Sequence, residues 1–429
     1  MEPHDGAHAC STPGRRRYRV ADAVVEAFAR PDRLCQRAEL NQQRLDEFLT
    51  ARRLTRRDVL QLGSILSFGT VASPLLGGAD ATRAWPLYRP IAGGADAPVA
   101  EPGGREHRVE SIEGETVQIG LFDPALPPIL TIDSGDTVVY PNTLQHYGGR
   151  IYFGMPLAER QRLREQYAGR GPHSNIGPIA VRDAMPGDVI ECRILKADPV
   201  DWGYNNSTPG SGALPDDFTT PHLRYFRFDL ERMTTEFMPG LEIPLGPFQG
   251  ILGVQPPGDQ PVSSVPPGPY GGNMDLRELV VGTRLFLPVF HPGGKLWTGD
   301  SHAAQGDGEV NLTAIETAMR EVRIQYVLHK QVGLRWPMVE TPTHWISLGM
   351  DPDLDEACTI CLRQMIEFLE ASLGLDPLDA YSLCSIAVTF RVTQVVDGYK
   401  GIHGMLAKDL FHPALREQLS IVAPRRPRH

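Results

Sequence analysis

Two stretches of the chain, ILTIDSGDTVVYP at residues 129–141 and PIAVRDAMPGDVIECRILKA at residues 178–197, share one design. In each, a Gly-Asp pair leads into a run in which apolar and polar residues alternate. Glycine and aspartate favour tight turns, and alternation with a period of two is typical of strands with one buried face. These stretches therefore predict antiparallel strands joined by short turns, and they favour packed sheets over a helical bundle.

Neighbouring segments extend this pattern. TVQIGLF at 116–122 and VVGTRLFLPVF at 280–290 alternate similarly, and AMREVRIQYVLHK at 318–330 predicts a long strand with Val322 and Tyr326 on one face. The chain holds 43 Gly and 38 Pro but only 7% aromatic residues, which favours many turns between short strands. The predicted fold is mainly β, a jelly-roll-like β-sandwich with a smaller β-barrel-like subdomain and an α+β C-terminal part.

The composition divides the chain into four parts. Residues 1–84 are expected to be an N-terminal extension with a signal peptide, and residues 105–200 to form the β-sandwich. Residues 201–412 are rich in Gly and Pro and should supply a loop-rich pocket, the strands around a metal loop and the α+β part. Residues 413–429 are expected to be a polar tail, in which the basic segment IVAPRRPRH at 421–429 is expected to be disordered.

A helix is predicted where DLDEACTICLRQMIEFLEASLG, residues 353–374, places apolar residues near a 3.6-residue spacing. Cys358 and Cys361 form a CxxC inside this helix, but they lack the Gly/Pro centre of a redox motif. We therefore interpret both cysteines as packing residues.

The net charge of −10 arises downstream of residue 84, because residues 1–84 are rich in Arg. An acidic body repels phosphate backbones, and the sequence has no basic patch interleaved with aromatic residues. We therefore expect no nucleic-acid partner. A small neutral or cationic substrate fits this charge better.

Residues 55–60, TRRDVL, form a twin-arginine pattern ahead of the apolar, glycine-containing run LQLGSILSFGTVASPLLGG at 60–78. The small residues Ala79 and Ala81, or alternatively Ala84, then offer a cleavage site. The run is too weakly apolar for a stable membrane span. It predicts export by the Tat translocation machinery to the periplasm or the extracellular space, and the alternative is a short buried helix.

The stretch GGNMDLRELVVGTRLFLPVFHPGGKLWTGDSHAAQGDGEVNLTAIE at 271–316 concentrates side chains that carry chemistry. On extended backbone Asp300 and His302 project to the same side, and Asp307 and Glu309 repeat that relation after a glycine-permitted bend. An imidazole with carboxylates is a ligand set for a divalent ion, with zinc expected and calcium as the alternative. Such an ion would activate water for attack on an amide carbonyl. Turn capping by Asp beside Gly explains the same residues, and spacing alone does not decide between the two interpretations.

Other side chains near these motifs also have more than one interpretation. Asn273 and Asp275 are either ligands or a turn bracket, and His173 is a ligand, a proton donor or a hydrogen-bonded loop histidine. His146 is a weaker candidate of the same type, and His291 is expected to pack within a loop.

The motifs GGNMD, LPV, GDSHAAQGDGEV and TAIE closely resemble the signature stretch of the acetamidase/formamidase family. HSNIGPIAVRDAMPGDVIECRI, PFQGILGVQPP and RVTQVVDGYKGIHGMLAK are similar to further motifs of that family. The resemblance spans roughly residues 105–412.

This resemblance implies a β-rich hydrolase of linear amides with a metal ion near the HAAQGDGE loop. By position it implies ligation by Asp300, His302 and Glu309, with His173 and Asn273 as additions. Glu309 would be a ligand or the general base, and Asn273 or a loop N–H would steady the oxyanion. The chain departs from the family pattern at four positions of its closing motif, Thr389, Phe390, Gly404 and Ala407. Substrate preference is therefore the feature that the resemblance fixes least.

Three functions remain to be weighed. The leading hypothesis is an exported metal-dependent amidase that releases ammonia from a small or linear carboxamide such as formamide or acetamide. The second is a non-catalytic extracytoplasmic ligand-binding protein on the same fold. The third is an amidase with Cys384 or Cys192 as nucleophile, for which no Cys-Glu-Lys arrangement is present at the usual spacing. The sequence leaves assembly into a homo-oligomer open.

Overall fold

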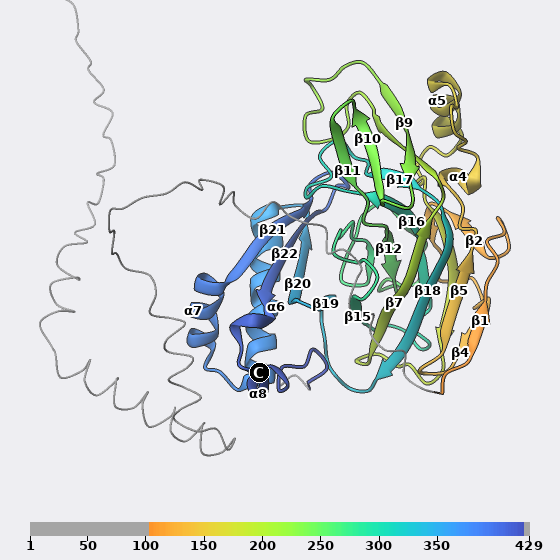
Figure 1. Ribbon diagram of the computed structural model, residues 1–429. Coiled ribbons are helices and arrows are strands. Elements are labelled where there is room, and N and C mark those ends of the chain that lie inside the picture. Colours follow the sequence, from red (N-terminus) through yellow and green to blue (C-terminus); the bar gives the residue numbers. More distant parts are fainter. Residues whose placement is uncertain (1–102, 424–429) are drawn as a thin grey trace, which may run out of the picture. The chain divides into compact units, whose positions relative to one another are not determined.

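The structure, a computed structural model, describes residues 103–423 (Figure 1). The predicted signal peptide and extension at residues 1–84 lie outside the described residues. Strands dominate the described part, as predicted, and they form two large sheets and one two-stranded sheet. No helix in residues 103–423 is both long and apolar enough to cross a membrane.

The first sheet has nine strands. Their order is β1 (Glu106–Arg108), β5 (Thr137–Pro141), β18 (Met319–His329), β7 (Val189–Pro199), β15 (Arg284–Pro288), β19 (Met338–Glu340), β20 (His344–Asp351), β22 (Lys400–Ala407) and β21 (Val388–Gln394). β18 is the long strand predicted from its alternation, and it pairs antiparallel with both β5 and β7. The two strands that follow Gly-Asp turns therefore flank one common partner.

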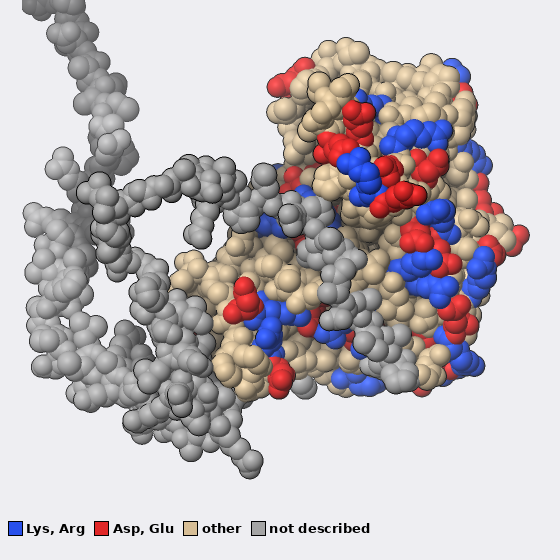
Figure 2. All heavy atoms as spheres, viewed as in Figure 1, with Lys and Arg blue, Asp and Glu red and all other residues tan. Residues whose placement is uncertain are grey.

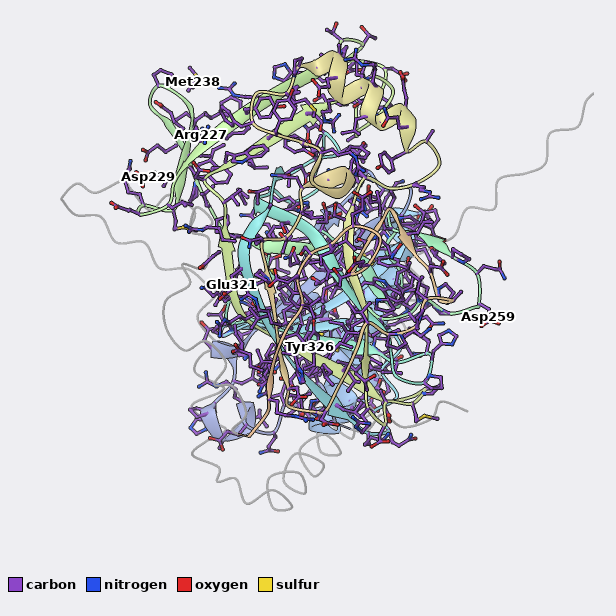
Figure 3. The ribbon with its side chains drawn as sticks, turned by 90° about the vertical axis from the view of Figure 1, so that its right-hand side faces the viewer. Arg227, Asp229, Met238, Asp259, Glu321 and Tyr326 are labelled. Carbon is purple, nitrogen blue, oxygen red and sulfur yellow. The ribbon has the colours of Figure 1, made fainter. Side chains whose placement is uncertain are left out.

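The second sheet has eleven strands. Eight follow in the order β11 (Leu241–Pro244), β10 (Thr234–Met238), β9 (His222–Asp229), β8 (Trp202–Ser207), β17 (Ile315–Thr317), β16 (Leu296–Ala304), β12 (Phe248–Gly253) and β14 (Gly271–Asn273). The other three are β6 (Ser174–Val181), which pairs with β16, and β2 (Val117–Ile119) and β4 (Leu130–Ile132), which pair with β6. β3 (Leu121–Phe122) and β13 (Val262–Ser263) form the small sheet. β16 thus lies inside the sheet, whereas the β9–β10 hairpin, marked by Asp229 and Met238, projects from the body (Figure 3).

The two Gly-Asp turns have the same construction. Gly135 and Gly187 adopt φ values of 93° and 92°, which favour glycine. The aspartate after each glycine accepts a hydrogen bond from the backbone N–H three residues earlier, at 3.0 Å for Asp136 and 2.8 Å for Asp188. One turn design therefore introduces both strands, as the sequence predicts.

An apolar core joins the two large sheets. Buried side chains of both sheets belong to a single cluster, among them Val138, Ile190, Ile324, Ile179, Phe248 and Trp297. Burial of apolar area at about 25 cal/mol per Å² is the dominant stabilising contribution in such a core. The core fixes β16, and with it the residues that this strand carries.

The C-terminal part adds helices to the first sheet. α6 (Leu354–Leu373) packs against β20 and β22, and α7 (Pro377–Ala387) packs beside α6 (Figure 1). The Asp353 side chain accepts hydrogen bonds at the start of α6, and Gly374 ends it in a left-handed conformation. Cys358 and Cys361 lie in α6 as free cysteines packed in an apolar cluster, which confirms their interpretation as packing residues.

Two features of the structure bear on the sequence-based division. Strands from residues 105–200 and 201–412, which were expected to be parts of one domain, alternate within both sheets. The expected polar tail begins with α8 (Pro413–Arg416), and its Leu419 is buried in the core beneath α6 and α7, as is Ile421, the first residue of the segment expected to be disordered. The remaining short helices are α4 (His146–Gly149), α5 (Leu157–Gln166) and η1 (Lys408–Leu410). The jelly-roll connection and a separate barrel remain predictions.

On one face of the protein, charged side chains are mixed rather than separated by sign. On the face shown in Figure 2, Lys and Arg lie among Asp and Glu. Lys196 and Arg323, for example, both pair with Glu321, at 2.9 and 2.8 Å. The charge of a surface region therefore depends on its own residues and not on the net charge of the chain.

Candidate metal and catalytic site

Strand β16 carries the two residues at the centre of the site, Asp300 and His302, whose Oδ2 and Nε2 atoms are 3.2 Å apart. His302 lies opposite Glu316 of β17, which lies opposite Tyr204 of β8. Side chains at paired positions of neighbouring strands share one face of a sheet. His302 Nε2 is accordingly 3.2 Å from Glu316 Oε2. The strand register thus aligns an imidazole, a carboxylate and a phenol.

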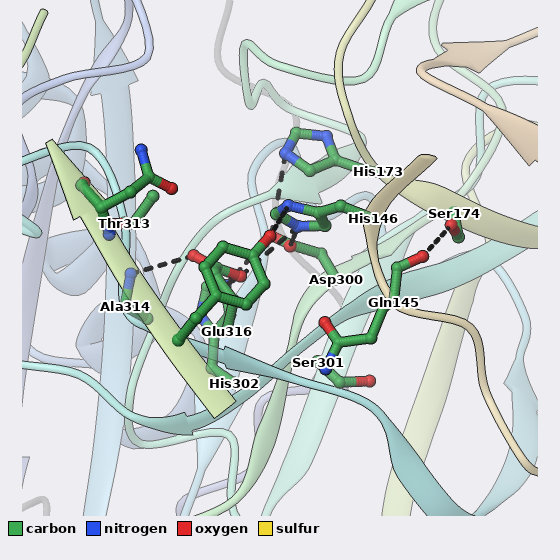
Figure 4. Close-up of polar contacts among 12 residues, drawn as sticks. Gln145, His146, His173, Ser174, Asp300, Ser301, His302, Thr313, Ala314 and Glu316 are labelled. Atoms are coloured by element: carbon green, nitrogen blue, oxygen red, sulfur yellow. Dashed lines mark hydrogen bonds and ion pairs between the residues drawn. The ribbon is translucent and has the colours of Figure 1, made fainter. Parts of the chain in front are cut away.

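Two more histidines reach Asp300 from outside the sheet (Figure 4). His146, at the start of α4, places Nε2 2.7 Å from Asp300 Oδ1, and His173, just before β6, places Nε2 3.9 Å from Asp300 Oδ2. The other ring nitrogen of each is held by a hydroxyl group, of Tyr204 at 2.9 Å and of Ser264 at 2.8 Å. An imidazole that is held through one nitrogen and directed through the other is typical of metal ligands.

Acidic side chains form the opposite wall of the site. Asp275 and Glu309 are buried, and Asp397 accepts a hydrogen bond from Asn273 Nδ2 at 3.0 Å. Both carboxylate oxygens of Asp275 and the amide oxygen of Asn273 are buried without a hydrogen-bond donor among the described residues. Buried polar atoms normally have partners. These orphaned acceptors therefore indicate a cation or a donor group of a ligand.

Three acids of the site have strained backbone conformations. φ is 55° at Asp300, 49° at Asp275 and 44° at Glu309. Residues other than glycine rarely adopt this region, and they persist there where the surrounding structure fixes them, often at functional sites. The fold therefore holds these carboxylates in place at a cost of about 1–3 kcal/mol each.

Gly250 of β12 leaves the space that the cluster occupies. A Cβ atom at this position would lie 2.6 Å from Asp275 Oδ1 and 2.8 Å from Asp300 Oδ2. Both distances are well inside van der Waals contact. The glycine of the PFQG motif is thus explained by the room that the carboxylates need.

Burial and neighbouring charges shift the pKa values of the site in opposite directions. Burial raises the pKa of Asp275 and of Glu309 well above the ordinary values, and nearby carboxylates add to this effect. Burial acts the same way on Asp300, but the neighbouring His302 and the hydrogen bond to His146 outweigh it and hold the pKa of Asp300 well below its usual value. Burial lowers the pKa of His173 to about 4, which leaves the neutral imidazole that can bind a metal.

Donor atoms in the described part of the chain gather in overlapping sets that could hold a cation. The sets of this site are His146, His173 and Asp300; Asp300, His302 and Glu316; and Asp275, His302 and Glu309. Two histidines and one carboxylate are a donor set of catalytic zinc, which keeps a coordination position open. Calcium prefers oxygen ligands alone and fits this first set less well. The residues therefore fit a zinc-like divalent ion.

A cavity of about 510 Å³ opens onto these side chains. Asp300, Glu316 and Glu309 line its floor together with the two outer histidines, and residues of α5 and of the following loop line it on the other side. The candidate centre is therefore reachable by a small molecule.

Three of the four metal ligands predicted from the loop lie in this site. Asp300 and His302 are at its centre and Glu309 borders the cavity. Asp307 points elsewhere, because its Oδ2 accepts a hydrogen bond from Arg391 Nε at 2.6 Å. The loop bends between Asp307 and Glu309, so the two side chains face different partners.

The remaining candidates also gather here, and one acid was missed. His173 and Asn273 line the cavity, and His146, the weaker candidate, lies closest to Asp300 among the three histidines. Asp397 lines the cavity although it is 124 residues from its partner Asn273, and sequence spacing contains no signal of such a contact. The match of RVTQVVDG to a family motif was the available indication.

Two other sequence-based interpretations concern residues outside the site. His291 Nε2 lies 3.0 Å from the carbonyl oxygen of Pro256, as expected of a loop packing residue. Cys192 and Cys384 are buried, and burial raises the pKa of Cys192 well above its ordinary value and that of Cys384 to about 11. Because the thiolate is the nucleophilic form, neither cysteine is suited to attack an amide.

The fold and the site together define a β-rich protein with a buried histidine–aspartate centre at the floor of a cavity. Residues 110–261 and 258–411 match the Acetamidase/Formamidase family. The chain therefore belongs to this family.

Individual relatives agree with the family match. An acetamidase of Bacillus halodurans is 30% identical with a TM-score of 0.64, and the alignment covers 73% of this chain and 100% of that one. An acetamidase of Yersinia enterocolitica is 29% identical with a TM-score of 0.66, covering 73% of this chain and 96% of that one. The acetamidase of Mycolicibacterium smegmatis is 27% identical over 199 residues, 32% of this chain and 49% of that protein. The chain spans 49% to 60% of the length of the curated relatives that it matches.

Proposed function

We propose that this chain hydrolyses the C–N bond of a carboxamide, with water, to a carboxylate and ammonia. The observation that carries the proposal is the convergence of His146, His173 and Asp300 on one point at the floor of a cavity, within a family whose named relatives are acetamidases and formamidases. The acids on the opposite wall provide groups for proton transfer.

His146, His173 and Asp300 would hold a divalent ion, for which the two imidazoles favour zinc over calcium. When bound, the ion would supply Lewis acidity that activates water and polarises an amide carbonyl. Tyr204 and Ser264 fix the ring orientation of the two histidines through their other nitrogens. This preorganisation would keep the Nε2 atoms directed at the ion.

The acidic wall would move the protons of the reaction. The oxygen of water bonds to the amide carbon and the C–N bond breaks; one proton of the water passes to the departing nitrogen to give ammonia, and the other is released when the acid product ionises to the carboxylate. Glu309 and Asp275 are suited to carry the proton that passes to the nitrogen, because burial raises their pKa values well above the ordinary carboxylate values and so favours the protonated form. Desolvation likewise raises the pKa of Asp397 to about 7.

Asn273 would bind the substrate through its amide oxygen. Its Nδ2 already donates to Asp397, which leaves the buried Oδ1 without a donor among residues 103–423. An N–H of the substrate amide satisfies that acceptor. The role expected from the family resemblance, donation to an oxyanion, would use the second hydrogen of Asn273 Nδ2, because only one of the two is donated to Asp397.

Ammonia release tests the proposal. Purified protein is assayed with formamide, acetamide and larger amides before chelation, after verified metal removal, and after zinc is restored. Activity that disappears with the ion and returns with it supports the mechanism, and equal activity after verified metal loss contradicts the role of the ion. Binding of amides without ammonia release would favour the alternative, a non-catalytic extracytoplasmic ligand-binding protein.

We further propose that the chain is exported through the Tat translocation machinery, on the basis of Arg56 and Arg57 and the apolar run that follows. Residues 1–84 fused to a reporter would reach the periplasm, and replacing both arginines with lysine would abolish this transport. Transport that survives the double replacement would contradict the proposal.

A further inference from the structure

The cavity is much larger than a formamide or acetamide molecule requires. Its volume of about 510 Å³ falls within the range of roughly 300–1,000 Å³ that is typical of pockets for drug-sized ligands. The substrate that fills this cavity therefore carries a substantial group beyond the amide.

Basic side chains of α5 and of the loop that follows it also line the cavity. Arg160 and Arg164 lie one turn apart on α5, which places them on the same face of the helix, and both line the cavity. Arg170, in the loop that follows, lines it as well, and Glu165 is the acid next to them. None of the three arginines forms an ion pair with a carboxylate within residues 103–423.

Arg160 is the most informative of these residues. Its side chain is 6% exposed, and its Nε has no hydrogen-bond partner in the described part of the chain. Its Cζ lies 5.6 Å from the centre of the Tyr204 ring, whose hydroxyl contacts His146. Burial of a guanidinium without a counter-ion is costly, and the aromatic ring offsets this cost only in part. An anionic ligand would supply the missing partner.

We propose that the substrate is a carboxamide that carries a carboxylate, of the class of monoamides of dicarboxylic acids. Its amide lies at the His146, His173 and Asp300 floor, and its carboxylate lies against Arg160 and Arg164. A guanidinium matches a carboxylate with two parallel N–H···O bonds, which makes arginine the side chain suited to this recognition. This inference rests on the proposed amide hydrolysis.

The acidic composition of the chain favours a neutral or cationic substrate, but local charge decides at this cavity. Charges farther apart than about 8–10 Å are largely screened at physiological ionic strength. The arginines of α5 face the cavity directly, whereas the acids of the surface are interspersed with basic side chains (Figure 2).

The experiment compares three amides that differ at one end, namely succinamate, butanamide and 4-aminobutanamide. The metal-loaded full chain is expected to show a KM for succinamate at least about tenfold lower than for butanamide, with 4-aminobutanamide the poorest substrate. Raised salt should reduce the preference. Equal KM values for succinamate and butanamide overturn the inference, and so does a preference for the cationic amide.

Two variants of α5 locate the effect. Arg164→Gln is expected to raise the KM for succinamate about tenfold while changing kcat little. Arg162→Gln is the matched control, because Arg162 is exposed on the same helix and does not line the cavity, so the same loss of charge should leave the KM unchanged. Both residues are exposed, which avoids the folding risk of altering buried Arg160. Equal effects of the two variants overturn the inference.

The failure of amide hydrolysis itself is distinguishable. If no amide releases ammonia, the anion subsite is tested instead by measuring the binding of succinamate and butanamide by calorimetry. Succinamate binding that Arg164→Gln weakens and Arg162→Gln leaves intact supports the anion subsite while the proposed hydrolysis fails. Absence of preferential succinamate binding overturns the inference.

Discussion

Two clusters in this protein combine histidine with carboxylates, and they balance their negative charge in different ways. In the candidate site, the ion pairs of Asp300 are with three histidines. In the second cluster, formed by Glu278, Asp307 and His403, the Arg391 side chain lies 2.8 Å from Glu278 and donates to Asp307 at 2.6 Å. A guanidinium that is part of the fold supplies there the positive charge that an ion would supply in the site. Histidine and carboxylate composition alone therefore does not identify a metal centre.

The second cluster supports the first through the backbone. The Gly308 N–H donates to the carbonyl oxygen of Thr393 at 3.0 Å, and the Val395 N–H donates to the carbonyl oxygen of Gly308 at 3.1 Å. These bonds fasten the loop that carries Glu309 to the segment that carries Asp397. The second cluster is therefore interpreted as a structural anchor of the catalytic wall.

The largest expected effect is on the rate of ammonia release. It appears when one carboxylate charge is removed from each cluster in turn and the two variants are compared. Asp300→Asn should reduce the rate of ammonia release about a thousandfold or more, because Asp300 belongs to two of the three donor sets of the site. Asp307→Asn should reduce it less than about tenfold, since Asp307 faces Arg391. Steady-state kinetics on the two purified variants checks this, and equal losses would remove the distinction between the clusters.

Removing the built-in cation tests the second cluster. Arg391→Gln leaves buried Glu278 without its guanidinium and should lower the free energy of unfolding by about 3 kcal/mol. The double variant with Glu278→Gln should recover part of this loss, because the uncompensated charge is gone. Denaturant unfolding of the two single variants and the double variant measures the coupling. Additive losses would show that the pair is not coupled.

The steric explanation for Gly250 can be tested by replacing this glycine, and as a control the nearby Gly246, with alanine. Gly250→Ala should weaken zinc binding about tenfold to a hundredfold, since the added methyl group meets Asp275 and Asp300. Gly246→Ala is the control, because its nearest neighbour would be 3.8 Å away. Competition with a chelator gives both affinities, and a similar affinity in the two variants would contradict the steric explanation.

The smallest effect is expected for Glu191, a buried carboxylate whose negative charge is compensated by basic side chains, as it is in the second cluster. Burial opposes ionisation of Glu191, but hydrogen bonds from His329 and Arg193 lower its pKa to about 2. Because the folded pKa lies below the unfolded value, the contribution to stability is complete above pH 4.5 and is lost as the pH falls toward 2. The stability difference between the wild type and Glu191→Gln should therefore shrink by about 2 kcal/mol over this interval. A constant difference would contradict the assignment.

The sequence predicted those parts of the site that depend on local geometry. Asp300 and His302 are two residues apart on one strand, so a period of two was sufficient to place them together. His146 is 154 residues from Asp300, and its contact depends on how α4 meets the second sheet. The fold behaves similarly, since the strands after Gly-Asp turns were predictable from local pattern, whereas their pairing with β18 is a long-range property.

The net charge of the chain is likewise a property of the sequence that does not describe the site. The net charge of −10 describes the whole chain and led to the expectation of a neutral or cationic substrate. The cavity is instead lined on one side by Arg160 and Arg164, which only the position of α5 brings to the site. The net charge of the chain therefore does not describe the charges that a ligand would meet in this cavity.

The metal content of the purified protein tests the central claim most directly. Elemental analysis should find about one equivalent of a divalent ion, zinc in the first place, per wild-type chain, and almost none in a His146→Ala, His173→Ala double variant that retains its fold by circular dichroism. A wild-type chain that hydrolyses amides without a bound ion, or a double variant that keeps a full equivalent, would contradict the account.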